Sequence, residues 1–417
     1  MRVLFLGTTD NHGGAARAGF RMFKGLKETD LDVKMFVNDK YSADNSVFQP
    51  SSKAKKYIAR FIFKAEKIFY SRYKNKKPGL MTTGQWSKRC VKEVCKLNAD
   101  ILHFHWVSGA LFSIGDIASF KKPIVWTLHD MWAFTGGCHY SENCDRYTLN
   151  CGKCPKLGSN SKRDISSYVL SRKMNLWKRN DFTIICPSKW LAECASQSSL
   201  FKDRRIEYIP YGIDLEEFKP HDKAAARELM NLEPNKKYIL FGAMSATTDK
   251  RKGFHLLKEA MDQLSQNHNL KEEYEIIVFG AEEPANPENL GFKINYLGQV
   301  NDSVTLRLMY SSADVLVAPS MEDNLPLTIM ESLACGTPVV GFEVGGIPDM
   351  IEHERNGYLV KKFDTIDLAN GITWVLENPE RWQQLSQRAR TKMLEEFELS
   401  LIVRKHQELY QSLFRDN

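Results

Sequence analysis

The stretch from Val317 to Val340 reads VAPSMEDNLPLTIMESLACGTPVV. Its two ends are short apolar runs that predict buried strands, and the segment between them predicts a polar turn followed by a helix. Pro326 suits the first helical position, and Gly336 followed by Pro338 ends the helix. A strand, a helix and a second strand in this order are typical of a parallel sheet covered by helices.

The same alternation continues over most of the chain. Short apolar runs predict strands at 3–6, 33–37, 101–105, 124–128 and 183–186 in the first half, and at 239–241, 275–279, 294–296, 315–317 and 339–342 in the second. Amphipathic segments lie between them, such as the one that spaces Ala16, Gly19, Phe20 and Phe23 by three and four. We therefore predict an α/β fold built from Rossmann-like, doubly wound parallel sheets.

Two domains are expected, because 417 residues exceed what one hydrophobic core usually organises. The Pro- and Gly-marked connector at 209–214 divides the chain into halves of similar design. We predict an N-terminal domain at 1–210, a C-terminal domain at 211–395, and a final helix within 396–417 that packs back towards the N-terminal domain.

Composition and charge are those of an ordinary globular protein, with 43% hydrophobic and 26% charged residues and a net charge of +7. This basic excess favours an anionic partner such as a phosphate, a nucleotide or a lipid headgroup; we expect no nucleic acid. No run reaches the roughly 18 apolar residues of a membrane span, and the first residues do not read as a secretory signal. We therefore expect a cytoplasmic protein.

The predicted helix after Pro326 starts at the carboxyl edge of its sheet, where open α/β sheets bind ligands. Its first-turn N–H groups and positive dipole end suit a diphosphate. Asp323 lies just before this helix and Glu331 lies inside it, eight positions later. A carboxylate at that place can accept hydrogen bonds from two vicinal ribose hydroxyls.

This segment resembles the acidic-x7-acidic motif of the retaining GT-B glycosyltransferases of family 4, especially the subgroup similar to colanic acid biosynthesis transferases. The resemblance implies two Rossmann-like domains that face a cleft, with a nucleotide-sugar donor. Glu331 would bind the nucleotide ribose, and Asp323 would bind the donor sugar together with the backbone of Asn324, Leu325 and Leu327. The first acid is usually Glu in the family, and Glu322 is an adjacent alternative to Asp323.

Two further segments of the second half fit the same resemblance. Lys252 matches the family's lysine, and would neutralise the donor diphosphate and the charge that builds during transfer. Ala243 stands where the family has an arginine, so Arg251 or Lys250 would substitute. The turn ending at Val300 resembles the one that meets the nucleobase through its backbone. The resemblance implies no catalytic metal.

In the first half, Gly13 and Gly14 follow the first strand and let the backbone approach a ligand closely. The resemblance makes them the glycine loop of the family. His129 ends another strand, and the resemblance implies that it contacts and orients the donor sugar. His103, His105 and Trp106, at the neighbouring strand end, could line the acceptor side.

Four cysteines lie in a long loop at 136–158, with the spacing C-x5-C-x6-C-x2-C: Cys138, Cys144, Cys151 and Cys154. Together with a nearby histidine they could complete a tetrahedral structural zinc site. The alternative is four ordinary thiols or a redox-sensitive pair.

The segment 53–77 has ten Lys or Arg residues against one acid, Glu66, with aromatic and aliphatic residues between them. It could lie on an anionic membrane surface, or its apolar face could pack on the first domain. Membrane contact would suit a polyprenyl-linked saccharide acceptor and peripheral attachment to the cytoplasmic face.

The leading hypothesis is a retaining hexosyl- or deoxyhexosyltransferase of exopolysaccharide or lipopolysaccharide assembly, with a nucleotide sugar as co-substrate. A nucleotide-sugar 2-epimerase of the same fold is one alternative. A non-catalytic sugar-nucleotide-binding or scaffold protein is another.

Overall fold

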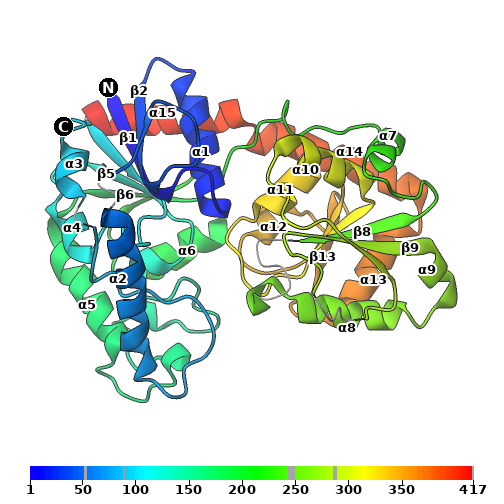
Figure 1. Cartoon of the computed structure of the whole chain (residues 1–417), viewed down its shortest axis with the longest axis horizontal. Helices are drawn as coiled ribbons and strands as arrows, with labels where there is room; N and C mark the ends of the chain where they lie inside the picture. Colours follow the sequence, from blue (N-terminus) through cyan, green and yellow to red (C-terminus); the bar gives the residue numbers. More distant parts are fainter. Residues whose placement is uncertain (51–53, 89, 243–248, 285–288, 416–417) are drawn as a thin grey trace. The chain divides into compact units, whose positions relative to one another are not determined.

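A computed structural model describes residues 1–50, 54–88, 90–242, 249–284 and 289–415, except for the side chains of 54–57, 59, 60, 63 and 67. The chain divides into two compact units (Figure 1). Unit 1 consists of Met1–Tyr211 with Ile402–Asn417, and unit 2 of Gly212–Leu401. No helix in the described ranges is both long enough and apolar enough to cross a membrane.

Unit 1 is built on a sheet of seven strands in the order β3-β2-β1-β4-β5-β6-β7, and every neighbouring pair is parallel. The strands are β1 (Arg2–Thr9), β2 (Asp32–Asp39), β3 (Val47–Phe48), β4 (Ile101–Phe104), β5 (Ile124–Thr127), β6 (Phe182–Cys186) and β7 (Arg205–Tyr208). The strands β4, β5 and β6 are buried along their whole length, as parallel strands covered on both faces must be.

The helices of unit 1 are α1 (Gly14–Lys27), α2 (Ala54–Ser71), α3 (Val91–Cys95), α4 (Ile114–Ser119), α5 (Ile165–Leu176) and α6 (Lys189–Gln197). The last helix of the chain, α15 (Leu399–Arg415), also packs on this unit. Its Tyr410 hydroxyl lies 2.6 Å from Nδ1 of His103 on β4. The chain therefore returns to its first unit after completing the second.

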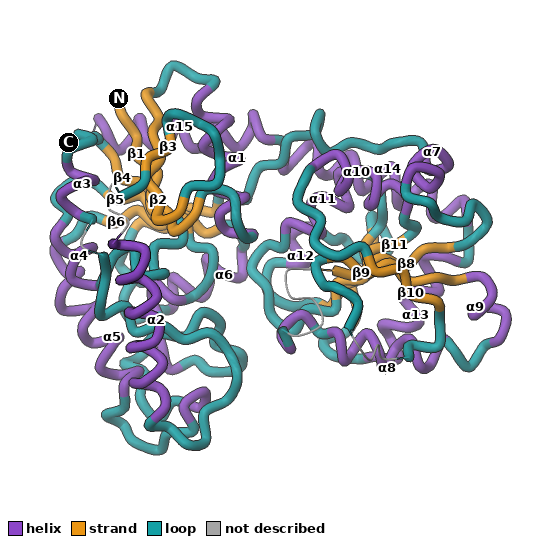
Figure 2. Tube along the Cα trace, in the orientation of Figure 1, coloured by secondary structure: helices purple, strands orange, loops and turns teal. Residues whose placement is uncertain are grey.

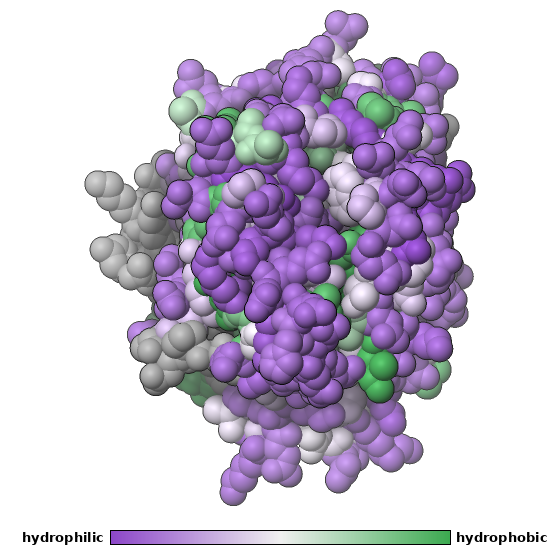
Figure 3. Space-filling view, turned by 90° about the vertical axis from the view of Figure 1, so that its right-hand side faces the viewer, coloured by the Kyte–Doolittle hydropathy of each residue, from purple (hydrophilic) through white to green (hydrophobic). Residues whose placement is uncertain are grey.

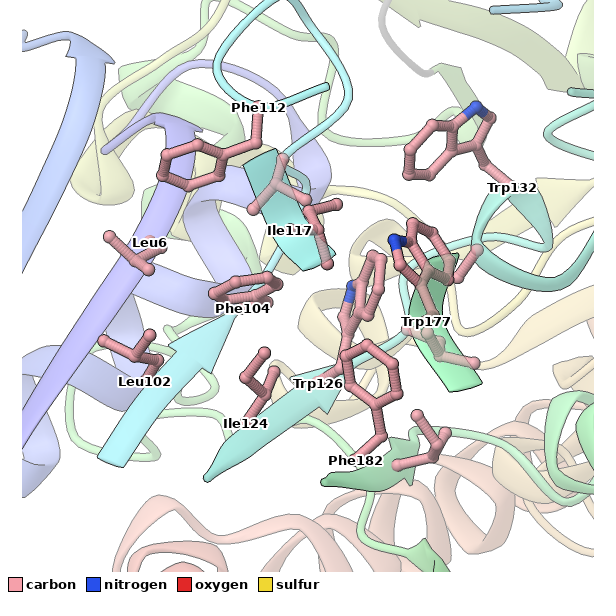
Figure 4. Close-up of a cluster of buried hydrophobic side chains, with 14 of the residues drawn as sticks. Leu6, Leu102, Phe104, Phe112, Ile117, Ile124, Trp126, Trp132, Trp177 and Phe182 are labelled. Atoms are coloured by element: carbon pink, nitrogen blue, oxygen red, sulfur yellow. The ribbon is translucent and has the colours of Figure 1, made fainter. Parts of the chain in front are cut away.

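The core of unit 1 is aromatic on one face of the sheet (Figure 4). The ring centroid of Trp126 lies 5.5 Å from those of Phe104 and Trp177, and Trp177 lies 5.8 Å from Phe182. These edge-on and tilted arrangements are the ones that aromatic quadrupoles favour. The cluster fixes β4, β5 and β6, and the carboxyl ends of β4 and β5 carry predicted site residues.

A lysine that forms no ion pair with a carboxylate among the described residues is buried beside this core. Lys173 of α5 is fully buried, and its ammonium donates to the carbonyl oxygens of Trp132 and Thr135 while lying 4.0 Å from the centre of the Trp132 ring. Burial lowers the pKa of Lys173 to about 7. The folded protein therefore releases this proton at a lower pH than the unfolded chain does.

Lys173→Met is expected to remove a pH dependence of stability. Between a pKa of about 7 in the folded state and the ordinary 10.5, the unfolded chain binds more protons, so the contribution of Lys173 to the free energy of unfolding rises with pH. The difference between wild type and variant should rise by up to about 1.4 kcal/mol per pH unit in this window. Denaturant titrations across this pH range measure it, with Lys178→Met as the exposed control; a difference independent of pH would contradict the assignment.

Unit 2 is built on a six-stranded parallel sheet in the order β10-β9-β8-β11-β12-β13. Its strands are β8 (Lys237–Gly242), β9 (Tyr274–Phe279), β10 (Lys293–Tyr296), β11 (Val315–Ala318), β12 (Val339–Phe342) and β13 (Gly357–Val360). The order reverses between β8 and β11, which is the arrangement of a doubly wound sheet. Figure 2 shows strands of this sheet in orange, with helices in purple around them.

The helices of unit 2 are α7 (Lys223–Leu229), α8 (Phe254–Leu264), α9 (His268–Glu273), α10 (Ser303–Ser312), α11 (Leu327–Ala334), α12 (Ile347–Met350), α13 (Thr365–Leu376) and α14 (Pro379–Lys392). Figure 1 shows α10 and α11 on one side of this sheet and α8 and α13 on the other. The face of the molecule seen in Figure 3 is largely hydrophilic, with hydrophobic residues scattered among polar ones. Scattered apolar residues of this kind are normal on a protein surface.

The predicted α/β fold of two parallel sheets is confirmed, and each of the ten predicted strands lies in an observed strand or overruns its end by one residue. Three strands were missed, namely β3, β7 and β13. All three lie at the edges of the sheets. Edge strands are short and partly solvated, so they lack the continuous apolar run that predicts a buried strand.

Candidate active site

The site in unit 2 begins where β11 ends. The polar turn after Ala318 leads into α11, which starts at Leu327 with Pro326 as its N-cap, one position later than predicted. Because all six strands are parallel, this turn shares one sheet edge with the loops that follow β8, β10 and β12. The predicted residues of the second half all lie on these loops or on α11.

Asp323 is the centre of a charged cluster. Its carboxylate is 7% exposed and accepts hydrogen bonds at Oδ2 from Nζ of Lys252 (2.6 Å) and Nη1 of Arg251 (3.3 Å). Burial alone would raise the pKa of Asp323, but the two cations outweigh it and hold the pKa below its ordinary value. The structure therefore brings the predicted acid and both predicted cations together.

Close backbone packing explains why these loops meet. Gly253 has a φ of +74°, and a Cβ there would lie 1.8 Å from the carbonyl oxygen of Pro319. Gly345 has a φ of +55°, and a Cβ there would lie 1.9 Å from the carbonyl oxygen of Asp323. Only glycine fits at either position. The two glycines therefore allow the loops after β8 and β12 to pack closely against the turn before α11.

Glu331 lies one turn into α11 and is only 2% exposed. Its Oε2 accepts a hydrogen bond of 3.0 Å from the hydroxyl of Tyr310 on α10. Tyr310 is itself fully buried, and its carbonyl oxygen accepts from the hydroxyl of Thr337. The carboxylate is therefore held in one orientation by a side chain that cannot move away easily.

The other predicted residues of unit 2 take these positions. Asn324 and Leu325 are buried in the turn, and Leu327 is the first residue of α11. Val300 follows a turn that continues the β9–β10 ladder, in which the N–H of Gly280 donates to the carbonyl oxygen of Gly298 (2.8 Å). Lys250, the alternative to Arg251, is exposed. Glu322, the alternative to Asp323, accepts a hydrogen bond from Arg251 at its carbonyl oxygen. Residue 243 lies outside the described residues.

In unit 1, Gly13 is the N-cap of α1, four residues after the end of β1, with a φ of +94°. A Cβ on the next residue, Gly14, would meet no atom within 4 Å. The start of α1 is therefore open for a close approach of a ligand to its backbone.

His129 lies just beyond β5 and is 9% exposed. Its Nε2 is 2.9 Å from Nδ1 of His105, and its Nδ1 is 2.7 Å from the hydroxyl of Tyr211. Burial lowers the pKa of His129 to about 4, so the ring is neutral. Both ring nitrogens thus have protein partners, which the sequence did not indicate.

The neighbouring aromatic and histidine side chains are also tied to the protein. His103 is fully buried between Tyr410 and the hydroxyl of Thr127, which lies 2.8 Å from its Nε2. The indole N–H of Trp106 donates to Asp130 at 2.9 Å. None of the His103 side chain reaches solvent, so the prediction that His103 lines the acceptor side is wrong.

The structure does not support the zinc site. Among the described residues, no group of three or more His, Cys, Asp or Glu side chains is placed to hold a metal ion. The adjacent His139 instead lies 2.7 Å from Asp130 at Nδ1 and 3.0 Å from the hydroxyl of Thr82 at Nε2. Cys138, Cys144, Cys151 and Cys154 are free thiols, and burial raises the pKa of Cys138 to about 11. The C-x2-C spacing is that of a zinc knuckle, but the described fold does not bring enough cysteine or histidine ligands together to hold a metal ion.

Sequence reasoning missed the side chains that hold the predicted ones in place. Tyr310 contacts Glu331, and Tyr211 contacts His129, each from another part of the chain. Tyr211 lies in the connector already identified from its Pro and Gly, which was the one local signal available.

Comparisons with known proteins give the family. A model described as Glycosyltransferase Family 4 matches residues 12–217, and one described as Glycosyl transferases group 1 matches residues 223–392. The Escherichia coli protein WcaC, named as a colanic acid biosynthesis glycosyl transferase, is 27% identical over 71% of this chain and 75% of its own length. D-inositol 3-phosphate glycosyltransferase 2 from Catenulispora acidiphila is 29% identical over 44% of this chain, a match that spans less than half (45%) of that relative.

Solved structures show the same fold. Sucrose-phosphate synthase from Thermosynechococcus elongatus superposes with a TM-score of 0.71 at 20% identity, covering all of both chains. HepE from Anabaena, solved with UDP-glucose, gives a TM-score of 0.66 at 16% identity over 99% of this chain and 100% of its own. WaaG superposes with a TM-score of 0.66 at 14% identity, covering 98% of this chain and 99% of its own. The chain therefore belongs to the GT-B glycosyltransferases, with a family 4 domain followed by a group 1 domain.

Proposed function

We propose that this protein is a retaining glycosyltransferase that moves a sugar from a nucleoside-diphosphate sugar to a saccharide acceptor in surface polysaccharide biosynthesis. The observation that carries the proposal is the cluster of Asp323, Lys252 and Arg251 at the start of α11, with Glu331 buried on the same helix. A diphosphate can be bound by the N-terminus of a helix and by two cations, and the ribose attached to it can be bound by a buried acid.

The nucleotide end is assigned to α11. Glu331 would accept hydrogen bonds from the two ribose hydroxyls, with Tyr310 fixing the orientation of the carboxylate. The backbone before Val300 would meet the nucleobase. The complexes of HepE with UDP and with UDP-glucose, in a protein of the same fold, support a nucleotide-sugar donor.

The transfer step follows from the charges. The acceptor oxygen forms a bond to the anomeric carbon, the bond from that carbon to the diphosphate breaks, and the departing phosphate takes the acceptor proton. Negative charge thus builds on the diphosphate, where Lys252 and Arg251 stabilise it. A lysine ammonium has three donors, so the bond from Lys252 to Asp323 leaves it able to contact a phosphate. We propose that these cations, rather than a metal, neutralise the leaving group.

Two similar proteins support the acceptor class: WcaC is named for colanic acid biosynthesis and WaaG for lipopolysaccharide biosynthesis. Such acceptors are saccharides, which we propose are linked to a polyprenyl lipid. The protein would then act in the cytoplasm at the membrane surface.

Helix α2 offers a surface for that membrane contact. One face of α2 packs inward through Ile62, Glu66 and Tyr70, and Glu66 accepts from the hydroxyl of Thr83 at 2.8 Å. Phe61 and Ile68 are 72% and 63% exposed. One face of α2 therefore packs on unit 1, while apolar side chains beside a basic segment remain exposed, and we propose that these exposed side chains contact the membrane. Lys53 lies outside the described residues.

Replacing Phe61 and Ile68 together with serine is expected to weaken binding to anionic vesicles roughly 10-fold or more, because two exposed apolar side chains no longer enter the interface. Sedimentation with vesicles of phosphatidylglycerol and phosphatidylcholine measures this. Leu229→Ser removes a side chain that is 66% exposed in unit 2 and is the matched control. Equal binding by all three proteins would remove α2 as the membrane contact.

The function itself is tested by thermal-shift screening against UDP-, GDP- and dTDP-sugars, followed by product analysis with the sugar that binds. Slow release of free sugar without an acceptor supports a transferase. Conversion of one nucleotide sugar into another would instead show the 2-epimerase, and binding without turnover would show the non-catalytic alternative.

A further inference from the structure

Unit 1 contains a pocket that no residue proposed to bind the donor lines. Its walls include Arg146, Lys153 and Lys162, and its volume is about 350 Å³. A pocket of this size can hold a small ligand or the headgroup of a lipid. All the residues that line it belong to the loop with the four cysteines, except Lys162, which follows that loop by a few residues. The proposed transfer reaction gives this segment no role.

The pocket is basic. The side chains that line it include three cations and no acid. Arg146, Lys153 and Lys162 are exposed, and within the parts of the chain that the structure describes none of them forms an ion pair with a carboxylate. Three like charges around one pocket repel one another, so an anion that enters between them is stabilised. Arginine and lysine are also the side chains that bind phosphate groups best.

The backbone holds these cations around the pocket. The N–H of Lys153 donates to the carbonyl oxygen of Ser161 at 2.6 Å, and the N–H of Cys151 donates to the carbonyl oxygen of Arg146 at 2.8 Å. Gly152, between them, is buried with a φ of +81°, and a Cβ there would lie 2.3 Å from the carbonyl oxygen of Lys162. The segments that carry the three cations are therefore packed directly against one another before any ligand binds.

An apolar side chain stands beside the cations. Leu149 also lines the pocket and is 75% exposed. A site for a soluble phosphate has no use for an exposed leucine, whereas a membrane surface offers an anionic headgroup and an apolar layer next to each other. The combination of cations with Leu149 therefore favours a lipid over a soluble anion.

The pocket segment is also tied to the chain that follows α2. The N–H of Lys77 donates to the carbonyl oxygen of Lys156 at 2.8 Å, and the N–H of Ile165 donates to the hydroxyl of Tyr73 at 3.0 Å. Figure 1 shows the end of α2 beside these loops. The pocket thus belongs to the same part of unit 1 as the exposed apolar side chains of α2 that are proposed to contact the membrane.

We infer that the pocket of Arg146, Lys153 and Lys162 binds the phosphate of an anionic phospholipid headgroup, while Leu149 enters the apolar layer beside it. This gives unit 1 a second membrane contact, separate from α2. The inference rests on the proposed function only for the membrane-linked acceptor, which gives such a contact its purpose.

The test measures sedimentation of the full-length protein with vesicles of phosphatidylglycerol and phosphatidylcholine. Lys153→Gln combined with Lys162→Gln is expected to weaken binding roughly 10-fold or more, because two cations no longer face the headgroups. The matched control, Lys121→Gln with Lys122→Gln, removes the same charge from two exposed residues shortly before β5 and should bind as the wild type does. Equal binding by the wild type and the pocket variant, or equal weakening by both variants, would overturn the inference.

Two further measurements separate a lipid from a soluble phosphate. Leu149→Ser is expected to weaken binding to the same vesicles roughly 3-fold or more, since an exposed apolar side chain no longer leaves water. Melting temperatures are recorded with and without inorganic phosphate. A site for soluble phosphate would show a rise in the wild type but not in the pocket variant, with equal vesicle binding by both, and this result would overturn the inference.

The pocket and α2 are separated by combining their variants. The two lysine substitutions are introduced into Phe61→Ser with Ile68→Ser, at a phosphatidylglycerol content at which that protein still binds. A further loss of binding is expected, and no further loss would overturn the inference. No nucleotide sugar enters these assays, so a failure of the donor panel refutes the proposed function and leaves the lipid result as measured.

Discussion

Replacing Lys252 with alanine is expected to lower kcat for sugar transfer by about 100-fold or more, while the affinity for the nucleotide sugar falls much less. The reason is that charge on the diphosphate grows as the bond to the sugar breaks, so a cation beside it stabilises the transition state more than the ground state. Lys252 is held at that place by its 2.6 Å bond to Asp323 and by the left-handed Gly253 that follows it.

Steady-state kinetics with saturating acceptor, together with calorimetric binding of the donor, separate the two effects. Lys271→Ala, which removes an exposed lysine on α9, is the control and should keep both values. A fall in donor affinity as large as the fall in kcat would show that Lys252 only binds the ground state. Unchanged kinetics would remove Lys252 from the site.

Glu331→Gln is expected to raise the dissociation constant of the nucleotide sugar roughly 10- to 100-fold, and that of the nucleoside diphosphate by the same factor. The variant keeps the shape of the side chain but replaces a charged acceptor by a neutral amide, whose NH₂ group cannot accept from a hydroxyl. Since the ribose belongs to both ligands, both should weaken equally, and kcat at saturating donor should change little.

Isothermal titration with both ligands is the measurement, and Glu228→Gln on the exposed side of α7 is the matched control. Because Glu331 is buried against Tyr310, the melting temperature of the variant must be recorded as well. A folded variant that binds the nucleoside diphosphate as tightly as wild type would refute the ribose assignment.

The parts of the site that sequence reasoning found are those determined by local chain geometry. The turn before α11 is marked by Pro326, and the end of the helix by Gly336 with its φ of +76°. These residues restrict the backbone wherever they occur, so the strand, turn and helix could be recognised without knowing the rest of the fold. The positions of Asp323 and Glu331 follow directly from them.

The parts that were missed depend on contacts between distant segments. Tyr211 lies 82 residues from His129, and Lys252 lies 71 residues from Asp323. Lys252 and Asp323 were each identified as site residues because they match family motifs, although their contact was not predicted, whereas no motif marks Tyr211 as a partner of His129. The cysteine loop shows the opposite error, since a familiar spacing suggested a metal site that the described fold does not assemble.

The return of α15 to unit 1 has a consequence for how this chain is made. During translation the residues of unit 2 leave the ribosome before Ile402 does. Part of the surface of the first half therefore stays uncovered until the residues from Ile402 onward have been synthesised. His406 and Tyr410, which pack against His103, are supplied only after all of unit 2 has been synthesised. A chain truncated before Ile402 would therefore lose part of unit 1 rather than of unit 2, and the nascent first half would be the segment most in need of a chaperone.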